Sequence, residues 1–288
     1  MHQSQLESLS IITDCSCYEV EYYPKGGLHK LKSLKRLCWR APNPGYICDL
    51  TDMIYTNAVS LQHLEVDLVS WEYVGSERRL DPYQDGPGGL ADSLRFWRAP
   101  EGKISGPTLP ALQTLCLTEV GLGKASAGVF DFSMLRTLKL RNCDKWDRLL
   151  EDAVRLRLPI GLKILEIHAR HDRTVVIQGY HREEVPNADE ILLKFLAAFN
   201  GLEELYVGLE GTVLFDKILP GLLAHRATLK RFVHDLRTVG GHPDPEHPLN
   251  AISSLDDDES VRLLDQFQLR AMGLSLNPAQ LVSVSKAD

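Results

Sequence analysis

The chain has 288 residues, of which 32 are Lys or Arg and 39 are Asp or Glu, so its formal net charge is −7. With 44% hydrophobic and 25% charged residues, it has the composition of a globular chain rather than a disordered or collagen-like one. The mildly acidic balance, without long basic runs, argues against nucleic-acid binding and against binding to anionic membranes.

The sequence carries no sign of export. Its opening segment, MHQSQLESLSIITDCSC, lacks the basic and apolar regions of a signal peptide, and no stretch approaches the ~18 uninterrupted apolar residues of a membrane helix. Its 6 cysteines are too sparse for a disulfide scaffold. We therefore expect a cytoplasmic or nuclear protein, without a membrane partner and monomeric on its own.

A short leucine pattern recurs along the chain: an aliphatic residue, two variable positions, an aliphatic residue, one variable position and an apolar residue. It begins at residues 6, 34, 61, 112, 135, 162, 202, 229 and 264, the last two copies being weaker. Four of the eight intervals lie within one residue of 27. Each copy ends in a period-2 alternation, which predicts strands. Leu-x-x-Leu also marks one face of an amphipathic helix, but unrelated helices would not keep this interval.

Helices are predicted between some of these strands. DKWDRLLEDAVRLRL (144–158) is the clearest amphipathic stretch, and Asn187 is a candidate N-cap for a helix over 188–199 that ends at Asn200-Gly201. Residues 214–227 and 256–267 are further candidates. Strands that alternate with helices predict an α/β fold with a parallel sheet.

Three stretches interrupt the repeat. Residues 76–108 are rich in Gly, Pro and charge, and form either a decayed repeat or an inserted loop. Residues 168–187 contain a possible extra strand at Thr174–Ile177, and the prolines of 240–248 exclude regular structure there. We expect residues 277–288 to be a flexible tail.

The copy at Leu135, Leu138 and Leu140 also has Cys143 at the ninth position, and so matches the form L-x-x-L-x-L-x-x-N/C. The sequence resembles the leucine-rich-repeat family, and in particular the repeat half of F-box proteins, which are substrate receptors of ubiquitin ligases. The resemblance implies a single solenoid over 1–276, a horseshoe with parallel strands on its concave face and helices on its convex face. No F-box is recognised, since a repeat begins at Leu6, so binding to a ligase core is not carried over.

Motifs for chemistry are weak, and we expect no catalytic residues, cofactor or metal. GLGKASAG (121–128) fails both phosphate-loop patterns, because Ser126 and Ala125 stand where Gly and Ser/Thr are needed. His168, His171, Asp172 and His181 fit no zinc spacing, and His242 and His247 lie beside prolines. Cys15-x-Cys17 is a weak redox candidate.

A solenoid would instead offer a surface, because the residues between the apolar positions point outward. In the copies from 34 to 135 these outward positions are Arg36, Cys38, Arg40, His63, Glu65, Asp67, Thr114, Cys116, Thr118, Thr137, Lys139 and Arg141; in the later copies they are Ile164, Glu166, His168, Glu204, Tyr206, Gly208, Arg231, Val233, Asp235, Gln266, Gln268 and Arg270. We expect a protein partner to bind on Lys139, Arg141, Glu166, His168, Glu204 and Tyr206. Cross-strand ion pairs with no partner are the alternative.

Three functions are compatible with these features. The first is a non-catalytic protein–protein interaction scaffold that binds its partner on the concave face. The second is the substrate-receptor part of an F-box-type ubiquitin-ligase assembly. The third is an enzyme with a cleft at the 76–108 insert.

Overall fold

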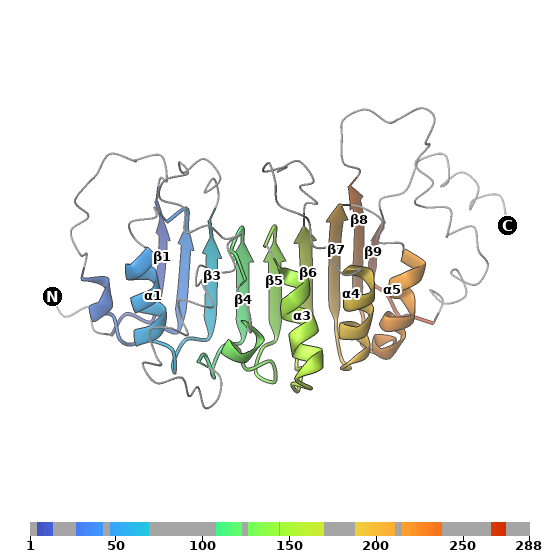
Figure 1. Cartoon of the computed structure of the whole chain (residues 1–288), viewed down its shortest axis with the longest axis horizontal. Helices are drawn as coiled ribbons and strands as arrows, with labels where there is room; N and C mark the ends of the chain where they lie inside the picture. The colour runs from blue at the N-terminus through green and yellow to red at the C-terminus, as the bar shows by residue number, and fades with distance from the viewer. Residues whose placement is uncertain are drawn as a thin grey trace, which may run out of the picture. The chain divides into compact units, whose positions relative to one another are not determined.

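The computed structural model describes residues 5–13, 27–42, 47–68, 108–122, 126–143, 145–169, 188–210, 215–237 and 266–274 (Figure 1). The chain forms two compact units, Met1–Leu162 and Lys163–Asp288. Every strand pairing within each unit is parallel. Both units therefore have the α/β architecture that the sequence predicts. Among the described residues, no helix is long and apolar enough to cross a membrane.

The described residues of the first unit form five strands whose order follows the chain. They are β1 (Ser8–Ile12), β2 (Arg36–Arg40), β3 (His63–Asp67), β4 (Thr114–Thr118) and β5 (Thr137–Arg141). The connections carry the short helix η2 (Leu28–Lys30), α1 (Ile47–Thr56) and η5 (Ser126–Val129), and α3 (Trp146–Arg155) follows β5. Parallel neighbours need such crossovers, because a tight turn can join only antiparallel strands.

The second unit repeats this plan with β6 (Ile164–Ala169), β7 (Glu204–Glu210), β8 (Arg231–Arg237) and β9 (Ala271–Leu274). Its helices are α4 (Ala188–Ala197), α5 (Phe215–Leu222) and the short η6 (Leu223–His225) that continues α5. Within each unit the helices lie on one side of the strands (Figure 1). The predicted helices at 144–158, 188–199 and 214–227 are confirmed, whereas most of 256–267 lies outside the described residues.

Eight of the nine strands begin two residues after the first leucine of their copy, as the pattern predicts. The ninth prediction, based on Leu264, Phe267 and Leu269, is wrong. Residues 266–270 are not a strand, and β9 pairs with β8 through Ala271 opposite Arg231 and Met272 opposite Phe232. The true copy is Leu269-x-x-Met272-x-Leu274, which overlaps the predicted one at Leu269. Gln266, Gln268 and Arg270 are therefore not the outward strand positions of this copy; Ala271 and Gly273 are.

Leucines of the repeat form the core of each unit. In the first unit Leu37, Leu64, Leu115 and Leu138 lie side by side across β2 to β5, and none is exposed. Helix α1 adds Leu50, Met53 and Ile54 to this core, and α3 adds Leu149 and Leu150. The strands from β2 to β5 alternate buried and more exposed residues, so one face is packed and the other reaches solvent. Strand β1 differs, since none of its residues is buried and Ile12 is 77% exposed.

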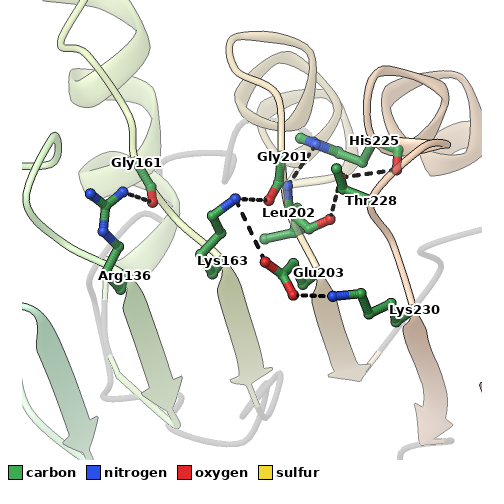
Figure 2. A network of polar contacts seen from close by, with 9 residues as sticks. All are labelled: Arg136, Gly161, Lys163, Gly201, Leu202, Glu203, His225, Thr228 and Lys230. Atoms are coloured by element: carbon green, nitrogen blue, oxygen red, sulfur yellow. Dashed lines mark hydrogen bonds and ion pairs between the residues drawn. The ribbon is translucent and has the colours of Figure 1, made fainter.

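A buried polar side chain four residues before a repeat leucine connects successive copies in each unit. Asn57 precedes Leu61 in this way, and its Oδ1 accepts the backbone N–H of Leu34 at 2.8 Å. His225 precedes Leu229, and its Nδ1 accepts the N–H of Leu202 at 3.2 Å (Figure 2). These bonds satisfy amides that would otherwise be buried without an acceptor.

A hydroxyl directly before the repeat leucine completes the same arrangement. Ser60 Oγ donates to the carbonyl of Leu34 at 3.0 Å, and Thr228 Oγ1 donates to the carbonyl of Leu202 at 2.8 Å. The sequences Asn-x-x-Ser-Leu and His-x-x-Thr-Leu thus perform one structural role in two copies. We refer to this arrangement as the copy junction.

Glycine replaces the hydroxyl residue at two other junctions, where the chain approaches a neighbour closely. At Gly161 a Cβ would clash with the carbonyl oxygen of Ser133, and the Gly161 carbonyl accepts a bond of 2.8 Å from Arg136. Gly201 has a φ of 91°, and Lys163 donates to its carbonyl at 3.0 Å (Figure 2). Glycine is therefore favoured at position 161 because a side chain would clash, and at position 201 because the positive φ disfavours other residues.

Candidate functional site

The solvent-facing side of β2 to β5 in the first unit carries three rows of side chains, set by the strand register. The row at the start of the strands contains Arg36, His63, Thr114 and Thr137; the middle row contains Cys38, Glu65, Cys116 and Lys139; the last row contains Arg40, Asp67, Thr118 and Arg141. Neighbouring residues of a row lie on adjacent strands, about 4.8 Å apart. Side chains far apart in sequence therefore meet on this face.

Three potential metal ligands come together in these rows. The ligand atoms of Cys38, His63 and Glu65 all lie within 4.8 Å of one another. Cys38 Sγ lies 3.6 Å from Glu65 Oε2, and His63 Nε2 lies 3.6 Å from the same oxygen. The side chains of His63 and Glu65 are 23% and 45% exposed, so solvent ions can reach the cluster.

Burial and the neighbouring Arg36 set the charges in this cluster. Burial raises the pKa of the Cys38 thiol, and the hydrogen bond from the Arg36 guanidinium acts in the opposite direction. Burial also lowers the pKa of His63, helped by repulsion from Arg36 and opposed by Glu65. Both shifts favour the neutral forms of the thiol and the imidazole at neutral pH.

This geometry does not activate Cys38 as a nucleophile. A nucleophilic cysteine needs a lowered pKa, but the pKa of Cys38 is raised. Its thiol also donates toward Glu65 rather than to the ring of His63. A soft thiol, an imidazole and a carboxylate on one patch are instead a set of donors that transition metals accept.

The second unit contains four of the six residues that the sequence predicts for partner binding. Tyr206 donates to Glu204 Oε2 at 2.8 Å and accepts a bond of 3.0 Å from Arg231 on β8. Arg231 Nη1 also lies 3.5 Å from Glu204 Oε2. The bond to Tyr206, followed by attraction to Glu204, raises the pKa of Arg231. Glu204 and Tyr206 are thus engaged with a third residue that the prediction omitted.

The other two predicted residues of this unit lie on β6. Glu166 is opposite Tyr206, and His168 is opposite Gly208. A Cβ on Gly208 would come 2.7 Å from His168 Cδ2, so the glycine leaves room for the imidazole ring. The ring of His168 therefore lies over the neighbouring strand rather than projecting straight out.

Lys139 and Arg141, the remaining two predicted residues, belong to the first unit. They lie on β5 beside Cys116 and Thr118 of β4. The six predicted residues are thus divided between the units, two in the first and four in the second. Within each unit the strand register brings the members onto the same face.

The Cys38–His63–Glu65 cluster was not predicted from the sequence, although its residues were placed on the outward face. The signal was available: shifting the chain by 27 residues aligns Cys38 with Glu65 and Arg36 with His63. Searching for ligands across adjacent copies, rather than along one segment, would have found it. His171, Asp172, His181, His242, His247, Cys15 and Cys17 lie outside the described residues, as do Gly123–Ala125 of the tested glycine loop.

Comparison with models of protein families, with curated proteins and with solved structures returned no match.

Proposed function

We propose that this chain is a leucine-rich-repeat solenoid whose strand face binds a protein partner, without catalysis. The repeat type is supported by eight strands at the predicted place in their copies and by the shared copy junctions. It is also supported by Cys143, at the Asn/Cys position of the motif, whose Sγ donates to the Leu117 carbonyl at 3.3 Å. A polar residue at this position bonds the turn after one strand to the backbone of the preceding strand.

The alternation of burial along the strands is the observation that carries the proposal. Apolar residues, most of them leucines, occupy the buried positions of β2 to β5, and the opposite face holds half-exposed or exposed residues, most of them polar. A surface of this kind is larger and flatter than a small-molecule pocket, and repeat proteins use it to bind macromolecules.

The charges on this face favour a protein over a polyanion. In the first unit the cations Arg36 and Arg40 on β2 and Lys139 and Arg141 on β5 lie on either side of the anions Glu65 and Asp67 on β3, so basic residues do not form a continuous surface. A nucleic-acid site would need a continuous basic surface. In the second unit, Tyr206 adds an aromatic residue of a type that is enriched at protein interfaces. We place the chain in the cytoplasm or nucleus on its sequence alone.

The test uses the full chain as bait and then measures the Kd of each purified captured protein. The variant Arg141→Glu/Tyr206→Ala changes one strand-face position in each unit, and Lys194→Glu on α4 is the matched helix-side control. We expect the strand-face variant to bind at least about tenfold more weakly, because buried tyrosines dominate interface energies. The control should stay within about twofold, since exposed ion pairs such as Lys194–Glu190 contribute little.

Equal binding by the strand-face variant, or loss of binding in the helix-side control alone, would place the interface elsewhere and overturn the proposal. Melting temperatures within a few degrees of wild type verify that both variants are folded. The two alternatives, a ubiquitin-ligase substrate receptor and an enzyme with a cleft at 76–108, stay predictions. Residues 76–107 lie outside the described residues.

A further inference from the structure

We propose that Cys38, His63 and Glu65 form a binding site for one Zn²⁺ ion on the strand face of the first unit. Among the described residues, this is the one place where three or more His, Cys, Asp or Glu side chains bring their ligand atoms together. The inference is independent of the proposed function, because it concerns a metal ion that binds without a protein partner.

The distances suit a tetrahedral ion. Zinc lies about 2.3 Å from a sulfur and about 2.0–2.2 Å from nitrogen or oxygen, so the edges of its tetrahedron are about 3.5 Å long. The edge between Cys38 Sγ and Glu65 Oε2 and the edge between His63 Nε2 and Glu65 Oε2 are both 3.6 Å. The edge between Cys38 Sγ and a ring nitrogen of His63 is at most 4.8 Å, and rotation of the two side chains would close it.

The strands hold the ligands in this arrangement before an ion binds. Cys38 and Glu65 are register partners on β2 and β3, and His63 is two residues before Glu65 on the same face of β3. All three side chains therefore leave a regular sheet in one direction. A site built on paired strands loses less conformational freedom on binding than a site on a loop.

His63 supplies a second, independent observation. Its Nε2 atom is buried, and Glu65 Oε2, at 3.6 Å, lies beyond hydrogen-bond distance, so within the described structure this nitrogen makes no hydrogen bond. Buried polar atoms are satisfied in most proteins, and an exception calls for an explanation, of which a bound ion is one. A metal at the centre of the three ligands would accept the Nε2 lone pair and remove this cost.

The donor set favours zinc over hard cations. Calcium and magnesium prefer oxygen ligands alone, whereas Cys, His and carboxylate together are typical of Zn²⁺. Three protein ligands leave the fourth position to water. The Cys38 thiol releases its proton to solvent when the Zn–S bond forms, so ion binding is accompanied by loss of one proton.

Arg36 is the group that opposes the ion. Its guanidinium hydrogen-bonds to the Cys38 sulfur and would repel a cation at that position. The Arg36 residue is exposed, so its side chain can turn into solvent when the metal binds. Removing this cation by Arg36→Gln should therefore strengthen metal binding at the cluster. The same substitution should not change the affinity of a metal ion that binds elsewhere on the chain.

The test titrates the metal-free full chain with Co²⁺ and then displaces it with Zn²⁺, because tetrahedral cobalt reports thiolate ligation by a charge-transfer absorption. We expect one equivalent of Co²⁺ with this absorption in wild type. Cys38→Ser should lose the absorption. His63→Gln and Glu65→Gln should weaken cobalt binding at least about tenfold, because even the loss of a hydrogen-bond partner of a metal ligand typically has an effect of this size. Arg36→Gln should bind more tightly than wild type.

Cys116→Ser is the matched control, since Cys116 lies in the same row on the next strand but outside the cluster. It should bind cobalt like wild type. The proposal is overturned if wild type gives no charge-transfer absorption, if Cys38→Ser retains it, or if Cys116→Ser loses it equally. Circular dichroism before the metal is added verifies that each variant is folded, and no partner protein enters the measurement.

Discussion

Asn57 and His225 occupy the same position in two copies of the repeat, and each accepts the backbone N–H of the leucine that begins the preceding copy. Both are buried, at 1% exposure. An amide and an imidazole can replace one another here because each offers an acceptor and a donor on opposite sides of a flat group. They differ in one respect, since only the imidazole can take up a proton near neutral pH.

Asn57→Ala should destabilise the first unit by about 2–4 kcal/mol. Asn57 Oδ1 bonds the Leu34 amide, and its Nδ2 donates to the carbonyls of Leu31 and Met53, each at 2.8 Å. Alanine removes these partners of the Leu34 amide and the Leu31 carbonyl, whereas the Met53 carbonyl still accepts the backbone N–H of residue 57 at 3.1 Å. Urea denaturation measures the loss, and Ser60→Ala, which removes one half-buried hydroxyl, should cost about 1 kcal/mol or less. Equal effects of the two variants would contradict this role of Asn57.

His225 should make stability depend on pH. Burial lowers its pKa from the ordinary 6.5 to about 4. Its Nε2 donates to the Leu196 carbonyl at 3.0 Å, since Nδ1 already accepts the Leu202 amide, so the folded state holds the neutral ring. Between pH 6.5 and about 4 the unfolded chain takes up a proton that the folded chain does not. The free energy of unfolding should therefore fall by about 3 kcal/mol over that window and level off below it.

The control for this pH dependence is His225→Asn, which introduces the residue found at position 57. This variant should lose the His225 share of the slope between pH 6.5 and 4, although the smaller side chain leaves a gap beside Phe199, whose ring lies 4.7 Å from that of His225. Urea denaturation at several pH values gives both curves. Identical slopes in wild type and variant would show that His225 is not the responsible group.

Leu138→Ala should destabilise the first unit by about 2–5 kcal/mol, and Leu140→Ala should do the same. Both are buried, at 0% and 1% exposure, as expected for apolar positions of the repeat when the residues between them point outward. Met134→Ala, nearby but 40% exposed, is the matched control and should cost less than about 1 kcal/mol. A cost at Leu138 as small as that at Met134 would mean that Leu138 does not pack into the buried face described above.

Strand β1 should exchange its amide hydrogens faster than β3. Within the described residues β1 pairs with β2 alone, and its alternate residues are exposed or half-exposed, whereas β3 lies between two strands over a buried face. Few buried contacts give a low free energy of local opening. Hydrogen exchange read by mass spectrometry on peptides covering 8–12 and 63–67 measures the difference. Equal protection of both strands would contradict the expectation.

The sequence predicted the strands well because a copy contributes three apolar side chains at fixed spacing, and burial on one face leaves little freedom in register. The prediction of the ninth strand failed because two overlapping leucine patterns share Leu269. Phe267, which belongs to the first of these patterns, is buried although it precedes the strand. Hydrophobicity alone cannot choose between the two patterns. The pairing of Ala271 with Arg231 decides between them, and that pairing depends on the neighbouring copy.

The candidate sites were harder to predict for the same reason. Tyr206 was singled out as an aromatic on the outward face, but its bonds to Glu204 and Arg231 depend on the register of β7 and β8. The cluster of Cys38 with His63 and Glu65 depends on the register of β2 and β3. Contacts across copies become visible only when the copies are aligned with one another.

The order of strands in the first unit, β1 to β5 as in the chain, has a mechanical consequence. Within the described residues each strand is hydrogen-bonded to the strands next to it in the sequence, and no backbone pairing joins the first strand to the last. A pulling force on the two ends would open the pairings one at a time rather than shear them together. Each freed copy of about 27 residues would lengthen the chain by about 90 Å. This unit should therefore yield to tension in small steps, as an extensible element rather than a rigid one.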